Sequence, residues 1–523
     1  MCGILALLRK KINIEEALES LKPRGPDSTK AINIDNFYFG FQRLRINDLS
    51  PAGMQPFVID DIVLICNGEI YNHSLLTTLW FDNSKFASTS DCEVIIHLYK
   101  MFGIKATLEA LDGVFAFVLY DIKKKVLFAC RDRIGVRPLF VGGTNDTFGN
   151  INVLVPHAFS SEAKALELLD IDSIKQVPPA TYYTIHNNVV ETQKWWNIPS
   201  SIVPIKEPEI ADTLKYLLTK AVEKRLLCER PIGCLLSGGL DSSVIVSILA
   251  QFNTVNTYSI GFEESTDLIY ARKVAKHFNT NHHEFIITYK EALEAIEEVI
   301  YAIESYDITT VRASVGMYLL SKKIKEKYPD TVIFSGEGSD EMLCGYLYFH
   351  YAPLYSELFK ESRRLLSDIY LYDVLRADRC TAAHGLELRV PFLDSDVVKF
   401  CMELHGHHRS PIQNIEKYYL RKAFEDVLPH DIVWRKKEGM SDGIGGLKKP
   451  WYSFIQDYAE SKISDQMLDK YCGKYPAPHT KESCLYYSIF IKKFSHTPIT
   501  YHWMPKWQDT NDPSGRVLPA FNA

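Results

Sequence analysis

The chain has 523 residues, of which 46% are hydrophobic and 24% charged, and its formal net charge is −6. This length exceeds what one hydrophobic core usually supports, so two or three domains are expected. No long run of Lys or Arg is present, which argues against nucleic-acid binding and against a polybasic membrane patch. No apolar run approaches the roughly 18 residues of a membrane helix. Eleven scattered cysteines without a C-x-x-C pair indicate reduced thiols in the cytoplasm, and neither a disulfide framework nor a cysteine zinc site.

Residues 2 to about 190 are typical of short strands separated by turns. Val-, Ile-, Leu- and Phe-rich runs predict strands at 61–66, 113–120 and 125–130. A helix is expected over 90–103, where Ser90 or Asp91 could cap its start and Glu93 lies three residues after Ser90. The stretch 197–209 contains three prolines and little periodicity, which is typical of a linker.

From about residue 209 the pattern changes to alternating helices and strands. A long amphipathic helix is expected first, with an apolar stripe that contains Ile210, Leu214, Leu217, Leu218, Ala221 and Val222. Strands are predicted at 232–236, 255–262, 282–288 and 331–336, with helices at 241–252 and 268–278. Such alternation favours a parallel sheet. Beyond about residue 340 the chain is expected to be mostly helical.

The stretch Leu235–Ser243, LLSGGLDSS, is predicted to pass from a strand through a turn into a helix. Two adjacent glycines let the backbone approach a ligand, and the turn amides together with the helix N-terminus form an anion cradle. Asp241 would place a carboxylate beside a phosphate, which makes sense if Mg²⁺ lies between them. The simpler interpretation is a tight turn with a serine cap. No G-K-[ST] follows, so this is not a Walker A loop.

Cys2 stands directly behind the initiator methionine. One interpretation is a small apolar residue that begins a buried strand. In the other, Met1 is removed and Cys2 carries a thiol and a free α-amino group on the same carbon. An α-amine with a pKa of about 7.7–8 can accept the proton of a thiol whose unperturbed pKa is about 8.5. If Met1 is retained, that nitrogen is an amide and cannot act as a base.

These two features together resemble one protein family. S-G-G-x-D-S-S resembles the pyrophosphate loop of the ATP pyrophosphatases, and the Cys-Gly-Ile opening resembles the class II glutamine amidotransferases. The glutamine-hydrolysing asparagine synthetases join both in this order. The resemblance spans nearly the whole chain through blocks that include RGPDS (24–28), CNGEIYNH (66–73), RDRIGVRPLF (131–140), FSGEGSDE (334–341), AAHGLELRVPFLD (382–394) and WRKKEGMSDG (434–443).

The resemblance implies an α/β protein in two domains. An N-terminal-nucleophile hydrolase αββα sandwich at 2–195 would be the glutaminase, 196–208 the linker, and 209–523 a Rossmann-like ATP-pyrophosphatase domain with a helical C-terminal part. The implied reaction makes L-asparagine from L-aspartate, ATP and glutamine-derived ammonia through β-aspartyl-AMP, and it releases AMP, pyrophosphate and glutamate. ATP and Mg²⁺ are the implied co-substrate and metal. A cytoplasmic homodimer is implied, with no nucleic-acid or membrane partner.

The resemblance also assigns the glutaminase residues. Cys2 would be the nucleophile, with Asn67 and Gly68 as donors to the oxyanion. The residues that would hold glutamine are Arg43, Leu44, Arg45, Ile46, Asn47, Asn67, Gly68, Glu69 and Asp91. Among these, Arg43 would bind the α-carboxylate, and Asp91 with Glu69 the α-ammonium. Taken singly, Asn67-Gly68 could be a hairpin turn and Asp91 a helix cap. Pro23 stands where relatives often have histidine.

In the synthetase half, the implied ATP-binding residues are Leu236, Ser237, Gly238, Gly239, Asp241, Ser242, Ser243, Ile260, Ser335 and Gly336. Asp241 and Asp340 would hold Mg²⁺. Glu337 would accept a proton from ammonia, and Lys437 would neutralise phosphate charge, although adjacent Lys436 leaves that assignment ambiguous by one residue. Thr309, Thr310 and Arg312 would grip the carboxylates of aspartate. No chemical role is assigned to Cys344.

Three alternatives compete with this interpretation. A β-lactam synthetase shares the two-domain layout, but members of that branch usually lack the amino-terminal cysteine. Hexosamine-forming amidotransferases share only the first half, so the pyrophosphate loop argues against them. A non-catalytic regulator that binds glutamine or a nucleotide would not need Cys2, Asp241, Glu337 and Lys437 together.

Overall fold

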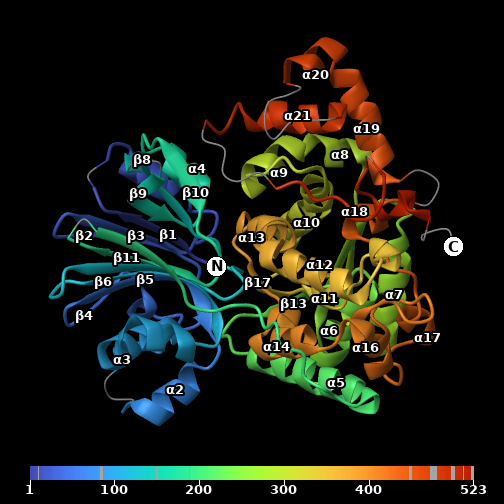
Figure 1. Cartoon of the computed structure of the whole chain (residues 1–523), viewed down its shortest axis with the longest axis horizontal. Coiled ribbons are helices and arrows are strands. Elements are labelled where there is room, and N and C mark those ends of the chain that lie inside the picture. Colours follow the sequence, from blue (N-terminus) through green and yellow to red (C-terminus); the bar gives the residue numbers. More distant parts are fainter. Residues whose placement is uncertain are drawn as a thin grey trace.

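The computed structural model describes residues 1–9, 11–82, 86–148, 151–187, 189–446, 450–471, 480–495, 501–510 and 512–519. Its first part is built on two antiparallel sheets and its second part on one parallel sheet, and the two parts lie side by side (Figure 1). Within the described residues, no helix combines the length and the apolar character that a membrane crossing needs.

The two antiparallel sheets of the first part pack face to face. One has the order β10-β8-β9-β1-β3-β2, built from β1 (Gly3–Leu7), β2 (Ser28–Ile34), β3 (Phe37–Arg43), β8 (Phe140–Phe148), β9 (Ile151–Ser160) and β10 (Ser173–Gln176). The other has the order β12-β11-β7-β6-β5-β4, built from β4 (Phe57–Ile59), β5 (Ile62–Ile70), β6 (Gly113–Asp121), β7 (Val126–Arg131), β11 (Thr181–His186) and β12 (Val189–Lys194). Ile4, Phe41, Val63 and Val118 belong to the apolar layer between the sheets. The strands predicted at 61–66, 113–120 and 125–130 are confirmed as β5, β6 and β7.

Helices cover the outer faces of both sheets. Leu18 of α1 (Ile14–Glu19) and Leu166 of α4 (Ala163–Glu167) pack on the first sheet, while α2 (His73–Trp80) and α3 (Val94–Ala110) pack on the second. The layers are therefore helix, sheet, sheet, helix, as the resemblance implied. The helix expected over 90–103 begins later, at Val94, after a 3₁₀ turn at Asp91–Glu93. The Glu93 carboxylate accepts hydrogen bonds from the amides of Ala87 and Ser88, so it forms no capping box.

The segment 195–206 connects the two parts without helix or strand. Its backbone is tied to the second part by the amide of Val203, which donates to the carbonyl of Glu403 at 3.0 Å. α5 (Glu207–Lys224) then begins with Pro208 in its first turn, where a missing N–H costs nothing. Ile210, Leu214, Leu218, Ala221 and Val222 of the predicted stripe are fully buried, and Leu217 is partly buried.

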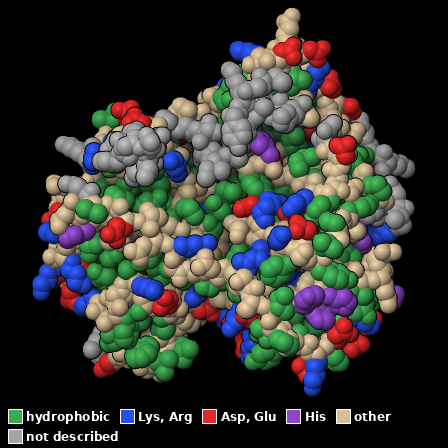
Figure 2. Space-filling view, in the orientation of Figure 1, with side chains coloured by type: hydrophobic (Ala, Val, Ile, Leu, Met, Phe, Trp, Pro, Cys, Tyr) green, Lys and Arg blue, Asp and Glu red, His purple; other side chains and the backbone are tan. Residues whose placement is uncertain are grey.

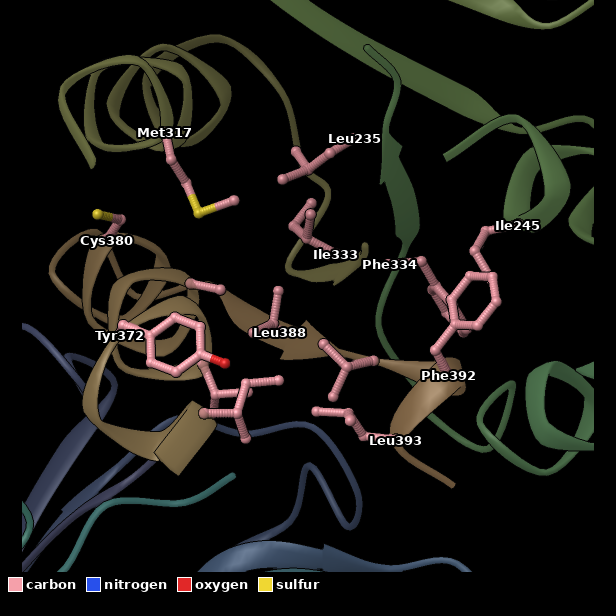
Figure 3. Close-up of a cluster of buried hydrophobic side chains, with 14 of the residues drawn as sticks. Leu235, Ile245, Met317, Ile333, Phe334, Tyr372, Cys380, Leu388, Phe392 and Leu393 are labelled. Atoms are coloured by element: carbon pink, nitrogen blue, oxygen red, sulfur yellow. The ribbon is translucent and has the colours of Figure 1, made fainter. Parts of the chain in front are cut away.

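The second part is centred on a parallel sheet of order β15-β14-β13-β16-β17, with β13 (Ile232–Leu235), β14 (Asn256–Gly261), β15 (Asn281–Ile286), β16 (Val332–Phe334) and β17 (Glu387–Arg389). Four of these strands are those predicted. β17 lies in the region expected to be mostly helical, and its three residues are too few to show a period. Apolar side chains cover the sheet, as Figure 3 shows for Leu235, Ile333 and Leu388, because parallel strands are buried on both faces.

Helices surround this sheet and continue to the end of the described chain. They are α6 (Leu240–Leu249), α7 (Thr266–Phe278), α8 (Tyr289–Glu294), α9 (Ile296–Ile303), α10 (Ile308–Lys327), α11 (Ser339–Met342), α12 (Tyr355–Asp368), α13 (Asp373–Ala382), α14 (Ser395–Glu403), α15 (Gly406–Arg409), α16 (Tyr418–Ala423), α17 (His430–Val433), α18 (Met440–Gly443), α19 (Trp451–Lys462), α20 (Asp465–Tyr471) and α21 (Lys481–Phe490).

Buried charges join the two parts where α13 and β17 face the sandwich. The guanidinium of Arg24 lies 2.8 Å from Glu162 and 2.9 Å from Asp378 of α13. In β17, the Arg389 guanidinium lies 3.4 Å from the Glu69 carboxylate of the first part. Because an unpaired buried charge is costly, these pairs favour a single arrangement of the two parts.

Candidate active sites

Cys2 lies at the border between the two parts, just before β1. Its backbone nitrogen donates to Asn67 Oδ1 at 2.9 Å, and its Sγ lies 3.6 Å from the Leu44 carbonyl. The Met1 side chain is buried, and the Met1 amine lies 3.6 Å from a Glu387 carboxylate oxygen. Burial raises the pKa of the Cys2 thiol, so a base close to the sulfur is needed to generate a thiolate.

Asn67 has an amide group that the surrounding protein uses only in part. Its Oδ1 accepts from Cys2, whereas its buried Nδ2 has no hydrogen-bond partner among the described residues. Gly68 follows it in β5, opposite Phe115, and a Cβ on Gly68 would lie 2.5 Å from the Val114 carbonyl. An unsatisfied buried donor beside a thiol is suited to an oxyanion that forms there.

Several of the predicted glutamine-binding residues are held by hydrogen bonds to their neighbours. Arg43 donates to the carbonyls of Ser50, at 2.7 Å, and Asp48, which leaves other guanidinium N–H groups for a ligand. The Glu69 carboxylate accepts from Asn47 Nδ2 at 2.6 Å.

The remaining residues of that set line the same border. Asp91 accepts from the amide of Ile70 at 2.6 Å, and burial raises the pKa of Asp91. Burial and the nearby Glu387 and Asp91 charges raise the pKa of Glu69 as well. Leu44 and Ile46 are buried, while the Arg45 carbonyl accepts from Arg230 of the second part at 2.9 Å. Of this set, Leu44 and Asn67 contact Cys2 directly, and Glu69 lies between Asn47 and Arg389 of the second part.

A cavity of about 210 Å³ opens at the carboxyl ends of β13, β14 and β16, where ligands bind in open α/β sheets. The predicted ATP-binding residues that line it are Leu236, Ser237, Gly239, Asp241, Ser242, Ile260, Ser335 and Gly336. Gly238 and Ser243 stand behind this lining. Gly238 has φ +70°, and a Cβ there would lie 2.4 Å from the Ala271 nitrogen, so the turn requires glycine. The Ser243 hydroxyl donates to the Gly239 carbonyl at 2.7 Å.

The turn before α6 leaves backbone donors for a ligand. α6 begins after Gly239, and no side chain caps its first amides. The hydroxyls of Ser237 and Ser242 lie 3.1 Å apart at the same turn. Uncapped first-turn amides beside two hydroxyls make a site for an anion such as a phosphate.

Two lysines and two aspartates meet beside this turn. The Lys417 ammonium lies 2.6 Å from Asp241 Oδ2 and 2.5 Å from Asp340 Oδ1, and the Lys437 ammonium lies 2.5 Å from Asp340 Oδ2. Burial alone would raise the pKa of Asp340, but the two ammonium groups outweigh it and hold that pKa at about 2. Lys437 therefore reaches the two aspartates, whereas Lys436 is exposed at the cavity rim.

Glu337 lies in the same cavity, just after β16. One of its carboxylate oxygens accepts from Arg376 of α13 at 3.0 Å, and the other accepts from the Ser335 hydroxyl at 3.3 Å. Burial raises the pKa of Glu337, while the Arg376 charge opposes that rise. A carboxylate with a raised pKa is a better proton acceptor than an exposed one.

Comparisons with known proteins agree with this geometry. The glutamine amidotransferase domain model matches residues 1–196, and the asparagine synthase model matches residues 213–367 and 354–508. The glutamine-hydrolysing asparagine synthetase of Gallus gallus is 42% identical over 563 residues, covering 100% of this chain and 99% of that protein. The Homo sapiens protein of the same name is 41% identical over 568 residues with the same coverage. The chain belongs to the glutamine-hydrolysing asparagine synthetase family.

Among solved structures, a glutamine phosphoribosylpyrophosphate amidotransferase from B. subtilis is 15% identical, with a TM-score of 0.32 over 64% of this chain and 81% of that one. That similarity is too low to support an inference. Full-length similarity to named asparagine synthetases confirms the predicted family and favours it over the β-lactam synthetase and regulator alternatives.

Two of the three residues expected to grip aspartate in an asparagine synthetase lie elsewhere. The Thr310 hydroxyl donates to Asp307 at 2.7 Å at the start of α10, and Thr310 does not line the cavity. Arg312 is buried behind the cavity, where its guanidinium lies 2.6 Å from Glu482 and 2.8 Å from Asp512. Only Thr309 lines the cavity. In this structure the Arg312 guanidinium donates to these two carboxylates, and its proposed contact with aspartate stays a prediction.

Two cationic residues that line the cavity were given no role on the basis of the sequence. Lys417 directly precedes α16, and Arg376 lies in α13. Each is one of several basic residues in its segment, a pattern that usually marks a solvated surface. In this asparagine synthetase they are buried, and each pairs with a predicted acidic residue.

Proposed function

We propose that this chain is a carbon–nitrogen ligase that makes L-asparagine from L-aspartate, with ATP activating the β-carboxylate and glutamine supplying the nitrogen. The observation that carries the proposal is one cavity that contains the Ser237–Ser243 turn, the Asp241–Lys417–Asp340 cluster and Glu337. This cavity offers separate places for phosphates and for a proton acceptor. The glutaminase residues around Cys2 would supply ammonia to it.

In the glutaminase half, removal of Met1 would turn the Cys2 nitrogen, which lies 2.9 Å from Asn67 Oδ1, into a free amine. That amine takes the thiol proton, and Sγ attacks the side-chain amide carbon of glutamine. The oxyanion then accepts hydrogen bonds from Asn67 Nδ2 and the Gly68 amide. The protonated amine gives its proton to the amide nitrogen, ammonia leaves, and water hydrolyses the thioester to glutamate. Arg43 would bind the α-carboxylate of glutamine, and Asp91 with Glu69 its α-ammonium.

In the synthetase half, a β-carboxylate oxygen of aspartate attacks the α-phosphorus of ATP. This forms a mixed anhydride with AMP and releases pyrophosphate from the Ser237–Ser243 turn. Ammonia then attacks the activated carbonyl carbon, Glu337 takes a proton from it, and AMP leaves. Lys417 and Lys437 move from carboxylates to phosphate oxygens when ATP binds, and they neutralise charge there.

The residues present fit Mg²⁺. Carboxylate oxygens are ligands that this ion prefers, and those of Asp241 and Asp340 already converge on one cationic group, the Lys417 ammonium. We therefore propose that Asp241 and Asp340 hold Mg²⁺ when ATP is bound. The bound ion would neutralise phosphate charge.

An isotope experiment tests the proposed reaction. Aspartate labelled with ¹⁸O in its β-carboxylate is incubated with ATP, Mg²⁺ and glutamine, and the products are analysed by mass spectrometry. The expected result is one ¹⁸O in AMP and equal amounts of pyrophosphate and asparagine. ADP as the nucleotide product, or unlabelled AMP, would contradict the proposal. Pyrophosphate release with another carboxylate but none with aspartate would favour a β-lactam-synthetase-like activity.

The state of the protein in the cell is also proposed. All ten cysteines among the described residues are free thiols, which supports a reducing compartment such as the cytoplasm. Family resemblance supports a homodimer. Sedimentation velocity at micromolar concentration tests the second proposal, and a sedimentation coefficient of a 59.8 kDa monomer would contradict it.

A further inference from the structure

A cluster of histidines lies outside both sites, in the segment HGHHR at residues 405–409. His407 and His408 belong to the short helix α15, which connects α14 to the segment before α16. Figure 2 shows histidine side chains gathered on one face of the second part of the molecule. Neither the glutaminase site nor the synthetase cavity contains these residues.

The side chains of this cluster converge with one carboxylate. One ligand atom each from Glu207, His407 and His408 lie within 4.8 Å of one another. Glu207 is the first residue of α5, and its Oε1 is 4.0 Å from His408 Nδ1. Two aromatic rings also pack against the histidines: the Tyr355 ring lies 5.6 Å from His407 and the Tyr419 ring 5.7 Å from His408.

We propose that Glu207, His407 and His408 form a binding site for a divalent transition metal ion, with Zn²⁺ the best match. Two imidazoles and one carboxylate are a ligand set that proteins use for Zn²⁺, with a fourth position left to water. Tetrahedral bonds of about 2.0–2.1 Å place ligand atoms about 3.4 Å apart. The 4.0 Å separation of Glu207 Oε1 and His408 Nδ1 therefore needs only a small rotation of the exposed Glu207 side chain. Ca²⁺ and Mg²⁺ fit poorly, because they require mostly oxygen ligands.

A further polar group lies beside the cluster. The Tyr419 hydroxyl is 3.5 Å from His408 Nδ1.

Metal binding would join two distant parts of the chain. It would connect the start of α5, directly after the 195–206 segment, to α15, and it would leave both catalytic centres unchanged. The expected effect is therefore resistance to thermal unfolding and not a change in the rate of asparagine formation.

Zinc binding is measured on the full chain after chelator treatment, by competition with a chromophoric chelator at pH 7.5. The variants are His407→Ala/His408→Ala and Glu207→Gln. The matched controls are His430→Ala, an exposed histidine of α17, and Glu209→Gln in the same turn of α5. We expect the double histidine variant to lose one bound Zn²⁺ and Glu207→Gln to weaken its affinity by about tenfold or more. Both controls should bind as the unmodified chain does.

Cobalt substitution separates this site from adventitious binding to a thiol such as that of Cys2. Co²⁺ at the proposed site should give d–d absorption without a thiolate charge-transfer band, and this absorption should vanish in the double histidine variant. Zinc should also raise the melting temperature of the unmodified chain and not that of the double variant. An unchanged number of bound metal ions in the double variant, or a purely thiolate spectrum, would overturn the proposal.

Discussion

The ammonium group of Lys417 lies 2.7 Å from Asp241 Oδ1 and 2.6 Å from Asp241 Oδ2, so the two side chains form a nearly symmetric pair inside the synthetase cavity. Lys417 itself has φ +54°, a left-handed conformation that is uncommon for a residue with a side chain. Strained backbone of this kind persists where the surrounding structure fixes it, often at functional sites. At this pair we therefore expect the Lys417 ammonium to move from the Asp241 carboxylate to a phosphate oxygen.

Replacement of Lys417 by methionine should abolish most asparagine synthesis. The change removes a buried cation that would stabilise phosphate charge, and losses of about 10²-fold in kcat are typical for such groups. Ammonia-dependent pyrophosphate release measures the effect, with basal glutaminase activity as a check on folding. Lys422→Met is the matched control, because Lys422 is an exposed lysine of α16, the helix that Lys417 directly precedes. A Lys417→Met rate within threefold of the control would remove Lys417 from the mechanism.

Replacement of Asn67 by alanine should impair only the use of glutamine. The side chain offers the unpartnered Nδ2 to the oxyanion, and loss of one such donor costs about 10²–10³ in kcat. Synthesis from ammonium salts should stay within twofold of the unmodified rate, as it should in Cys2→Ala. Loss of both activities in either variant would argue against separable sites.

The pH dependence of synthesis should follow the ionisation of Glu337. Burial raises its pKa, so the ionised base is present above that pKa and is lost as the pH falls through it. Arg376 lowers this pKa and Asp373 raises it. Arg376→Met should therefore move the acidic limb of the ammonia-dependent rate to higher pH, by about one unit or more.

Asp373→Asn should move the same limb in the opposite direction, to lower pH. The two substitutions neutralise neighbouring charges of opposite sign, since Arg376 lies 2.9 Å from Asp373. Rate profiles of both variants between pH 5.5 and pH 9 would check this prediction. Shifts in the same direction, or none, would show that Glu337 does not set the limb.

Long apolar runs made much of the fold predictable, and long-range pairing made the rest unpredictable. The strands at 113–120 and 232–236 could be predicted because each is a largely apolar run. They appear as β6 and β13, respectively. β17 has three residues and no such run. Cys2 and Asp241 belong to motifs with a local signature. Arg312 shows the limit, because its partner Glu482 is 170 positions away and no local pattern indicates that they pair.

Glu341 should make the protein less stable as the pH rises from about 5 to 8. Burial, with Asp373 and Asp340 nearby, raises its pKa to about 8. The folded state therefore keeps a proton that the unfolded state releases above about pH 4.3, so the free energy of unfolding falls by about 1.4 kcal/mol per pH unit in that window. Glu341→Gln should flatten this dependence. Urea midpoints at pH 5 to 8 measure it, with exposed Glu294→Gln as the control that keeps the slope.

Arg312 should act as a structural lock and not as a ligand for aspartate. Its guanidinium pairs with Glu482 of α21 and with Asp512, so it fastens α10 to two later segments of the chain. Removal of one partner from a buried ion pair costs about 3–5 kcal/mol. Arg312→Met and Glu482→Met should both reduce stability by such an amount, as measured by urea unfolding.

The Michaelis constant for aspartate separates the two roles of Arg312. If Arg312 has only a structural role, both variants should change this constant slightly and to a similar extent. The assay is done under conditions where both variants are folded. A direct contact with a substrate carboxylate predicts a much larger increase for Arg312→Met than for Glu482→Met, because only the first variant removes the guanidinium. An increase of about tenfold or more confined to Arg312→Met would restore the prediction made from the family resemblance, and it would require Arg312 to leave Glu482 when aspartate binds.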